Sequence, residues 1–203
     1  MSVSLASSQQ RLVILLHGMA GSGSSIMPIA GPWRRTLPNT RFAAPDAPFP
    51  GAQGGHQWFR VDGQELRPDH VDFVREAFDE LISEVVTREG FERALDRVAF
   101  VSVSQGSLMA LDAVASGRWQ IGALVSFAGL LPLRPAVMSN RMPILLIHGQ
   151  DDSSIPVQAS KAAAGQLRTA GFDVELEVLP GVGHTITPEG AEIALAFLRK
   201  QFA

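Results

Sequence analysis

The stretch V-A-F-V-S-V-S-Q-G, residues 98–106, decides the fold of this chain. Its first six residues have the composition of a buried strand, and the period of a helix begins just after it. A serine between strand and helix sits on a tight turn that exposes its hydroxyl. The pattern differs from the usual G-x-S-x-G only by Ser102. Ser104 is therefore the candidate nucleophile, and the alternative is a serine that only caps the helix.

Strands and helices alternate on both sides of this stretch. Besides Val98–Val103, short apolar runs predict strands at Leu12–Leu16, Arg41–Ala44, Ala123–Phe127, Ile144–Ile147 and Val174–Leu179. Helical periods predict helices from Pro68 to Gly90 and over Ser107–Ser116, Val157–Ala170 and Pro188–Phe202. Such alternation is typical of an open, mostly parallel sheet with helices on both faces. We expect one domain, residues 1–203, whose first ten residues form a flexible N-terminal segment.

A base and an acid for Ser104 follow it in the chain. A serine hydroxyl needs a base to act as a nucleophile, and in this kind of sheet the order is Ser, then Asp or Glu, then His. His184 is the only histidine after the two adjacent aspartates that follow a strand end, Asp151 and Asp152. All these residues lie in loops beyond strand carboxyl ends, where ligands bind in open α/β folds. Spacing alone leaves Asp151 and Asp152 open as the acid.

The glycine-rich loop H-G-M-A-G-S-G, residues 17–23, follows the first strand. Backbone N–H groups of such a loop and of the residue after the nucleophile form an oxyanion hole, which predicts Met19 and Gln105 as the two donors. The loop lacks the Lys and Ser/Thr of a phosphate-binding P-loop, so a nucleotide site is not expected. His17 and His148, each before a glycine at a strand end, are expected to pack or hydrogen-bond there.

Composition excludes several functions. The chain has a formal net charge of −3 and no basic block, which argues against a nucleic-acid partner. With no cysteine, disulfides, thiolate metal sites and a cysteine nucleophile are excluded. The start of the chain does not have the pattern of a signal peptide, and no apolar run approaches the length of a membrane span. We therefore expect a cytoplasmic protein.

These motifs resemble those of the phospholipase/carboxylesterase family of α/β-hydrolases, over nearly the whole chain from Leu12 onward. LLHGMAGSG resembles the family's oxyanion loop, APDAPFP followed by GGHQWF its proline-rich stretch, and SVSQGSLMAL its nucleophile turn. HGQDDSSIP is similar to its acid loop H-G-x-x-D-x-x-V-P, and GVGH to its histidine loop. The resemblance assigns the catalytic acid to Asp152. The departures, at Ser102, Val103, Ser153 and Ala20-Gly21, remove no catalytic atom.

The resemblance implies a serine carboxylesterase with the triad Ser104, His184 and Asp152 and with no cofactor or metal. The Gly129–Met142 loop is too short for a cap domain, so we expect an open cleft lined by Trp58, Phe59, Leu130 and Leu131. Such a cleft favours short- to medium-chain esters. Alternatives are a thioesterase or lysophospholipase with the same site, or a catalytically silent binding protein. The expected partner is a small ester, and the expected state is a monomer or homodimer.

Overall fold

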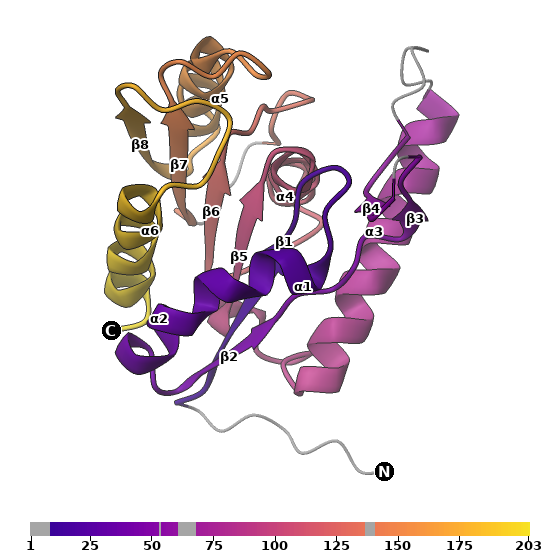
Figure 1. Cartoon of the computed structure of the whole chain (residues 1–203). Helices are drawn as coiled ribbons and strands as arrows, with labels where there is room; N and C mark the ends of the chain where they lie inside the picture. Colours follow the sequence, from indigo (N-terminus) through magenta and orange to yellow (C-terminus); the bar gives the residue numbers. More distant parts are fainter. Residues whose placement is uncertain (1–8, 53, 61–67, 137–140) are drawn as a thin grey trace.

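The computed structural model describes residues 9–52, 54–60, 68–136 and 141–203. The expected N-terminal segment therefore lies mostly outside the described residues. Six parallel strands form one sheet in the order β2-β1-β5-β6-β7-β8 (Figure 1). Their bounds are β1 Arg11–Leu16, β2 Thr40–Ala43, β5 Val98–Val103, β6 Ala123–Phe127, β7 Pro143–Gly149 and β8 Asp173–Leu179.

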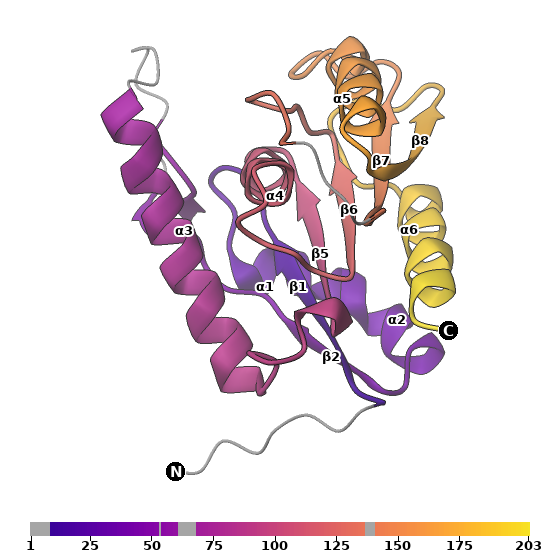
Figure 2. The ribbon, with the colours of Figure 1, turned by 180° about the vertical axis from the view of Figure 1, so that it is seen from behind.

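Helices cover both faces of this sheet. On one face lie α1 (Gly23–Ile26), α2 (Ala30–Thr36) and α6 (Pro188–Gln201), with the 3-10 turn Met27–Ile29 between the first two. On the other lie α3 (Pro68–Glu89), α4 (Gln105–Ala115) and α5 (Val157–Thr169), as the view from behind shows (Figure 2). Side chains alternate along β1: Leu12 and Ile14 join the core under α3 and α4, whereas Val13 and Leu15 join the core under α2 and α6. The predicted open α/β sheet is confirmed.

The strand order fixes where a site can form. From β1 the chain turns outward to β2, then crosses to β5 on the other side of β1 and continues through β6, β7 and β8. The carboxyl ends of β1 and β5 therefore flank a topological switch point, the place where open α/β sheets bind ligands. Ser104 follows β5, and the 17–23 loop follows β1.

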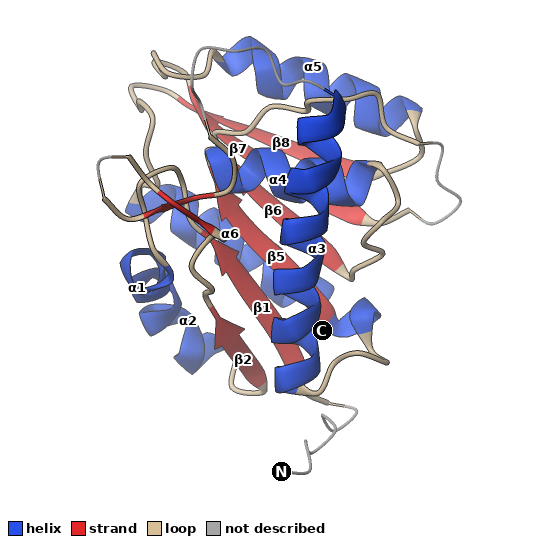
Figure 3. Cartoon of the chain, turned by 90° about the vertical axis from the view of Figure 1, so that its right-hand side faces the viewer, coloured by secondary structure: helices blue, strands red, loops and turns tan. Residues whose placement is uncertain are grey.

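Some elements differ from the sequence prediction. The chain between β1 and β2 forms α1 and α2, and two-residue strands β3 (Phe49–Pro50) and β4 (His56–Gln57) pair with each other between β2 and α3. Figure 3 shows α3 running along one face of the sheet. Between β6 and β7 there are only the 15 residues 128–142, and within their described part none is helical. No helix in the described ranges is long and apolar enough to cross a membrane.

Candidate active site

Ser104 occupies a strained turn between β5 and α4. Its φ is 53° and its ψ −119°, a conformation that non-glycine residues rarely adopt. The Ser104 N–H donates to Phe127 O over 3.0 Å, which ties the turn to the neighbouring strand β6. A Cβ on Gly106 would come within 2.6 Å of the Leu16 and His17 carbonyl oxygens, so the turn needs glycine there. Strain of this kind concentrates at functional sites.

Ser102 fits where the usual motif has glycine. It is fully buried, and its hydroxyl donates to Val125 O over 3.1 Å. Its Oγ also lies 3.1 Å from Ser107 Oγ, and Ser107 donates to Phe127 O over 2.9 Å. The departure from the motif thus leaves the Ser102 hydroxyl satisfied, which is the condition for burying it at low cost.

His184 links Ser104 to Asp152. The His184 Nε2 lies 2.9 Å from Ser104 Oγ, and its Nδ1 lies 2.7 Å from Asp152 Oδ2. A neutral imidazole that donates through Nδ1 to the carboxylate accepts the serine proton at Nε2. The three residues come from the ends of β5, β7 and β8, and the arrangement has the geometry of a nucleophile, a base and an orienting acid.

Hydrogen-bond donors around the Asp152 side chain favour its ionised form. Its Oδ1 accepts the N–H groups of Ser154 and Ile155 over 2.8 and 2.9 Å. Burial opposes ionisation, but the Ile155 N–H, His184 and the Ser154 N–H outweigh it and hold the pKa of Asp152 below its usual value. Asp152 is only 7% exposed, whereas Asp151 is exposed. The structure therefore brings Asp152 to His184.

The buried His148 supports the same loop. Its Nε2 lies 2.8 Å from Ile155 O and 3.3 Å from Asp152 Oδ2, and its Nδ1 lies 2.7 Å from Ser160 Oγ. A Cβ on the next residue, Gly149, would come within 2.4 Å of the Val182 and Gly183 carbonyl oxygens, so only glycine lets the His184 loop pack this closely. His148 hydrogen-bonds at the strand end, as the sequence predicts.

His17 fixes the loop that follows β1. Its Nε2 accepts the N–H of Ala47 over 2.9 Å, so its Nδ1–H donates to Gly18 O over 2.7 Å. Burial lowers the pKa of His17, which favours this neutral form over the opposing effect of the Gly18 carbonyl. Gly21 N–H donates to the same oxygen over 3.1 Å. Because the peptide is trans, the Met19 N–H points away from both donors.

Met19 and Gln105 are the predicted oxyanion-hole residues. In the part of the chain that the structure describes, neither N–H donates a backbone hydrogen bond, and Gln105 as the first residue of α4 has no partner within the helix. The two loops meet at the switch point, since a Cβ on Gly18 would come 3.4 Å from Ser104 Cβ. Met19 is 57% exposed.

The family follows from comparison with known proteins. The profile of the phospholipase/carboxylesterase family matches residues 3–202. The chain belongs to this family. It is 29% identical to the esterase YpfH of Escherichia coli, over 94% of this chain and 82% of that protein. It is 27% identical to acyl-protein thioesterase 1 of Gibberella zeae, over 97% and 92%. The crystal structure of esterase PE8 superimposes with a TM-score of 0.82 at 29% identity, covering 97% of this chain and 95% of that one.

These similarities confirm two predictions. The chain is a phospholipase/carboxylesterase family member with the α/β-hydrolase fold, and its enzyme class is that of serine hydrolases acting on ester bonds. Among the described residues, no cluster of three or more His, Cys, Asp or Glu side chains could hold a metal ion.

Trp58 differs from its predicted role in this family member. It was expected to line the cleft, yet it is 1% exposed, and its indole N–H donates to His17 O over 2.8 Å. The Gln105 side chain accepts the Trp58 N–H over 2.7 Å and donates to Phe59 O over 2.8 Å. The Gln105 side chain therefore holds the Trp58 backbone against α4, and the Trp58 ring is buried.

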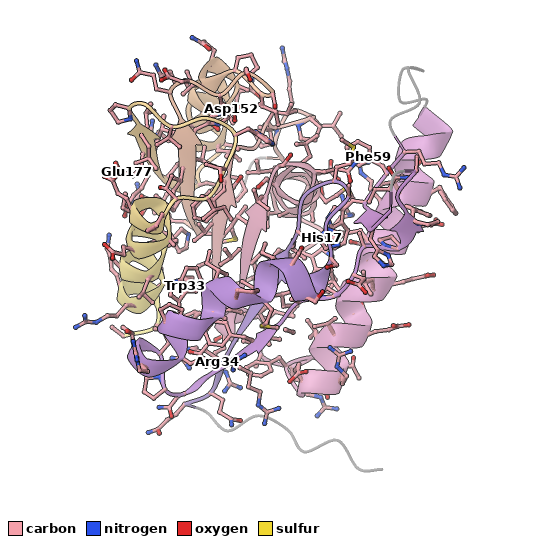
Figure 4. All side chains as sticks on the ribbon, in the orientation of Figure 1. His17, Trp33, Arg34, Phe59, Asp152 and Glu177 are labelled. Atoms are coloured by element: carbon pink, nitrogen blue, oxygen red, sulfur yellow. The ribbon has the colours of Figure 1, made fainter. Side chains whose placement is uncertain are left out.

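In Figure 4, Phe59 and Asp152 lie toward the top of the view, whereas Trp33 and Arg34 lie lower, on α2.

A pocket of about 250 Å³ opens between α3, α4 and the loop after β6. Its apolar lining is Phe59, Val74, Leu108, Met109, Pro132 and Leu133. Phe59 thus lies where the sequence expects a cleft residue. Leu130 and Leu131 are half-buried and do not line this pocket; the next two residues of their loop do. Sequence reasoning missed this difference because the direction of each side chain in a proline-containing loop depends on tertiary packing.

Proposed function

We propose that the chain is a serine carboxylesterase that works through an acyl-enzyme. Ser104 Oγ attacks the ester carbonyl while His184 Nε2 takes its proton, and His184 then gives that proton to the leaving alcohol. Water activated by His184 hydrolyses the acyl-enzyme, which returns Ser104. Asp152 keeps the His184 proton on Nδ1 and stabilises the imidazolium. The hydrogen-bonded chain from Ser104 through His184 to Asp152 carries this proposal.

The oxyanion of the tetrahedral intermediate would be held by the Met19 and Gln105 N–H groups. Support comes from the Gly18 carbonyl, which His17 and Gly21 hold so that the Met19 N–H faces the other way. Gln105 sits at the N-terminus of α4, where the helix dipole adds positive potential. Loss of one such donor costs about 10²–10³ in kcat in other hydrolases.

The acyl group would occupy the pocket beside α4. Leu108 and Met109, which line it, lie one turn beyond Ser104 and Gln105 on the same stripe of α4. A cavity of about 250 Å³ suits short and medium acyl chains. The same site supports a thioesterase as the second candidate, because one relative is named an acyl-protein thioesterase.

The test is covalent labelling followed by a substrate screen. Intact-mass analysis should show one organophosphonate adduct on the wild type and none on Ser104→Ala. Purified protein is then assayed on matched oxygen esters, thioesters and a lysophospholipid. We expect the highest kcat/KM on oxygen esters. Equal labelling of Ser104→Ala would remove the nucleophile assignment, and an unlabelled, inactive wild type would favour a silent binding protein.

A further inference from the structure

The pocket beside α4 has a charged end. Arg75 of α3 donates to Asp112 of α4 through Nε and Nη2, over 2.9 and 2.7 Å, and both residues line the pocket. Asp112 lies on the same stripe of α4 as Leu108, one turn further from Ser104. By helix geometry Leu108 is about 6 Å and Asp112 about 12 Å along the axis from Ser104. An acyl chain that follows this stripe therefore passes the apolar side chains before it meets the ion pair.

Further hydrogen bonds hold the ion pair in place at the end of the pocket. Asp112 is 6% exposed, and Arg118 Nη1 also donates to its Oδ2 over 2.8 Å. Arg118 Nε is held by Asp79 over 2.9 Å, and Asp79 in turn accepts the Trp119 indole N–H over 2.6 Å. The network joins α3, α4 and the turn after α4, and it holds Asp112 from two sides, through Arg75 and through Arg118.

The terminal methyl group of an acyl chain gains no binding free energy at this end of the pocket. Each CH₂ buried against apolar side chains is worth on the order of fourfold in binding. A methyl group pressed against Arg75 and Asp112 instead displaces water from two charges and offers them no hydrogen bond, which is unfavourable. Displacing Arg75 to extend the pocket would also cost the two hydrogen bonds that it donates to Asp112.

We propose that the Arg75–Asp112 ion pair sets the maximum acyl-chain length that the enzyme accepts. This inference rests on the proposed esterase function. The pair acts as a polar end of the pocket, and replacing both charges by apolar side chains should let the end of an acyl chain lie there without displacing water from a charge. Selectivity then rises with chain length up to the ion pair and falls beyond it.

The test uses a double variant, Arg75→Met with Asp112→Leu, which replaces the pair by apolar side chains and leaves Arg118 paired with Asp79. kcat/KM is measured on p-nitrophenyl esters of increasing chain length, all below their aggregation limits. We expect the optimum of the double variant to move to longer acyl chains, with up to about fourfold gain for each CH₂ added beyond the wild-type optimum. Arg75→Lys keeps the charge and should keep the wild-type optimum.

A second ion pair provides the matched control. Lys200 and Glu175 pair over 2.9 Å between α6 and β8, outside the pocket, so Lys200→Gln with Glu175→Gln should leave the chain-length profile unchanged. Circular dichroism checks that each variant folds, and Arg75→Leu with Asp112→Ala replaces the first double variant if that one does not. An unmoved optimum in a folded double variant overturns this inference. A wild type that hydrolyses no ester overturns the esterase proposal instead.

Discussion

Ser104 combines a hydroxyl that lies 2.9 Å from His184 Nε2 with a strained backbone. At φ 53° and ψ −119° the turn lies in a region that favours glycine, and such strain costs about 1–3 kcal/mol. Glycine also adds about 0.4–1 kcal/mol of entropy to the unfolded chain. We therefore expect Ser104→Gly to be more stable than Ser104→Ala, by about 1 kcal/mol. Both variants lack the hydroxyl, so the difference between their free energies of unfolding, measured in urea, reports the backbone effect alone. An alanine variant at least as stable as the glycine variant would mean that the turn stores no strain.

The adjacent aspartates lie in different surroundings. Asp152 Oδ2 lies 2.7 Å from His184 Nδ1, whereas Asp151 is exposed and joins the loop through its N–H to Val182 O. Loss of the orienting acid can cost about 10⁴ in turnover. We expect a fall of that order in Asp152→Asn and a change of less than about tenfold in Asp151→Asn. Steady-state ester hydrolysis by the two variants decides the matter, and a larger loss in Asp151→Asn would reverse the assignment.

At the scale of elements, the loop from β1 to α1 is positioned by one buried histidine. His17 Nδ1–H holds Gly18 O and thereby aims the Met19 N–H. Removing the ring in His17→Ala should lower kcat by up to about the 10²–10³-fold known for loss of one oxyanion donor, while KM changes little. His17→Asn keeps a donor near the position of Nδ1 and should recover part of kcat. Equal loss of kcat and rise of KM in both variants would indicate general disruption of the loop.

The sequence predicts the long elements well and the short ones poorly. Strands such as Val98–Val103 stand out because both their faces are buried and their residues are almost all apolar. The helices α1 and α2 have only four and seven residues and include Gly31 and Pro32, so they carry no helical period. The choice between Asp151 and Asp152 depends on which carboxylate faces His184, a tertiary contact between residues 32 apart that spacing does not encode. The burial of Trp58 has the same origin.

For the molecule as a whole, the link between α3 and α4 makes stability depend on pH. Burial would raise the pKa of Asp112, but hydrogen bonds from Arg75 and Arg118 hold it below the usual value. A carboxyl with a lower pKa in the folded chain stabilises it above the unfolded pKa of about 3.9 and loses that contribution as pH falls through the folded value. We expect Asp112→Asn to cost about 3–5 kcal/mol at neutral pH.

That cost should shrink as the pH falls below about 4, because the unfolded wild-type chain then takes up a proton at Asp112 and the folded chain follows at its lower pKa. Urea unfolding of the wild type and of Asp112→Asn from pH 7 to pH 3 measures the gap, that is, the difference between their free energies of unfolding. Asp173→Asn, at the exposed start of β8, is the control and should give a small gap at every pH. A gap for Asp112→Asn that stays constant down to pH 3 would mean that the ion pair contributes no charge-dependent stability.

The connection from β6 to β7 bears on whether a lipid interface raises the reaction rate of the whole enzyme. Only 15 residues lie between these strands, too few for a separate cap domain over Ser104. Leu133 of this loop, which lines the pocket beside α4, is 49% exposed. Without a cap domain in this connection we expect no closed state for an interface to shift, because a ligand or surface moves an equilibrium only by its different affinity for two states. We therefore expect no activation at a lipid interface.

Hydrolysis of a medium-chain p-nitrophenyl ester is measured across the concentration at which the ester forms aggregates. The rate should follow one saturation curve below that concentration and level off above it, as free monomeric substrate stops rising. The control is a short ester that stays soluble over the same range, which should saturate with no break at that concentration. A jump in rate at the onset of aggregation, absent with the soluble ester, would show a closed state that opens at interfaces and would contradict an open site.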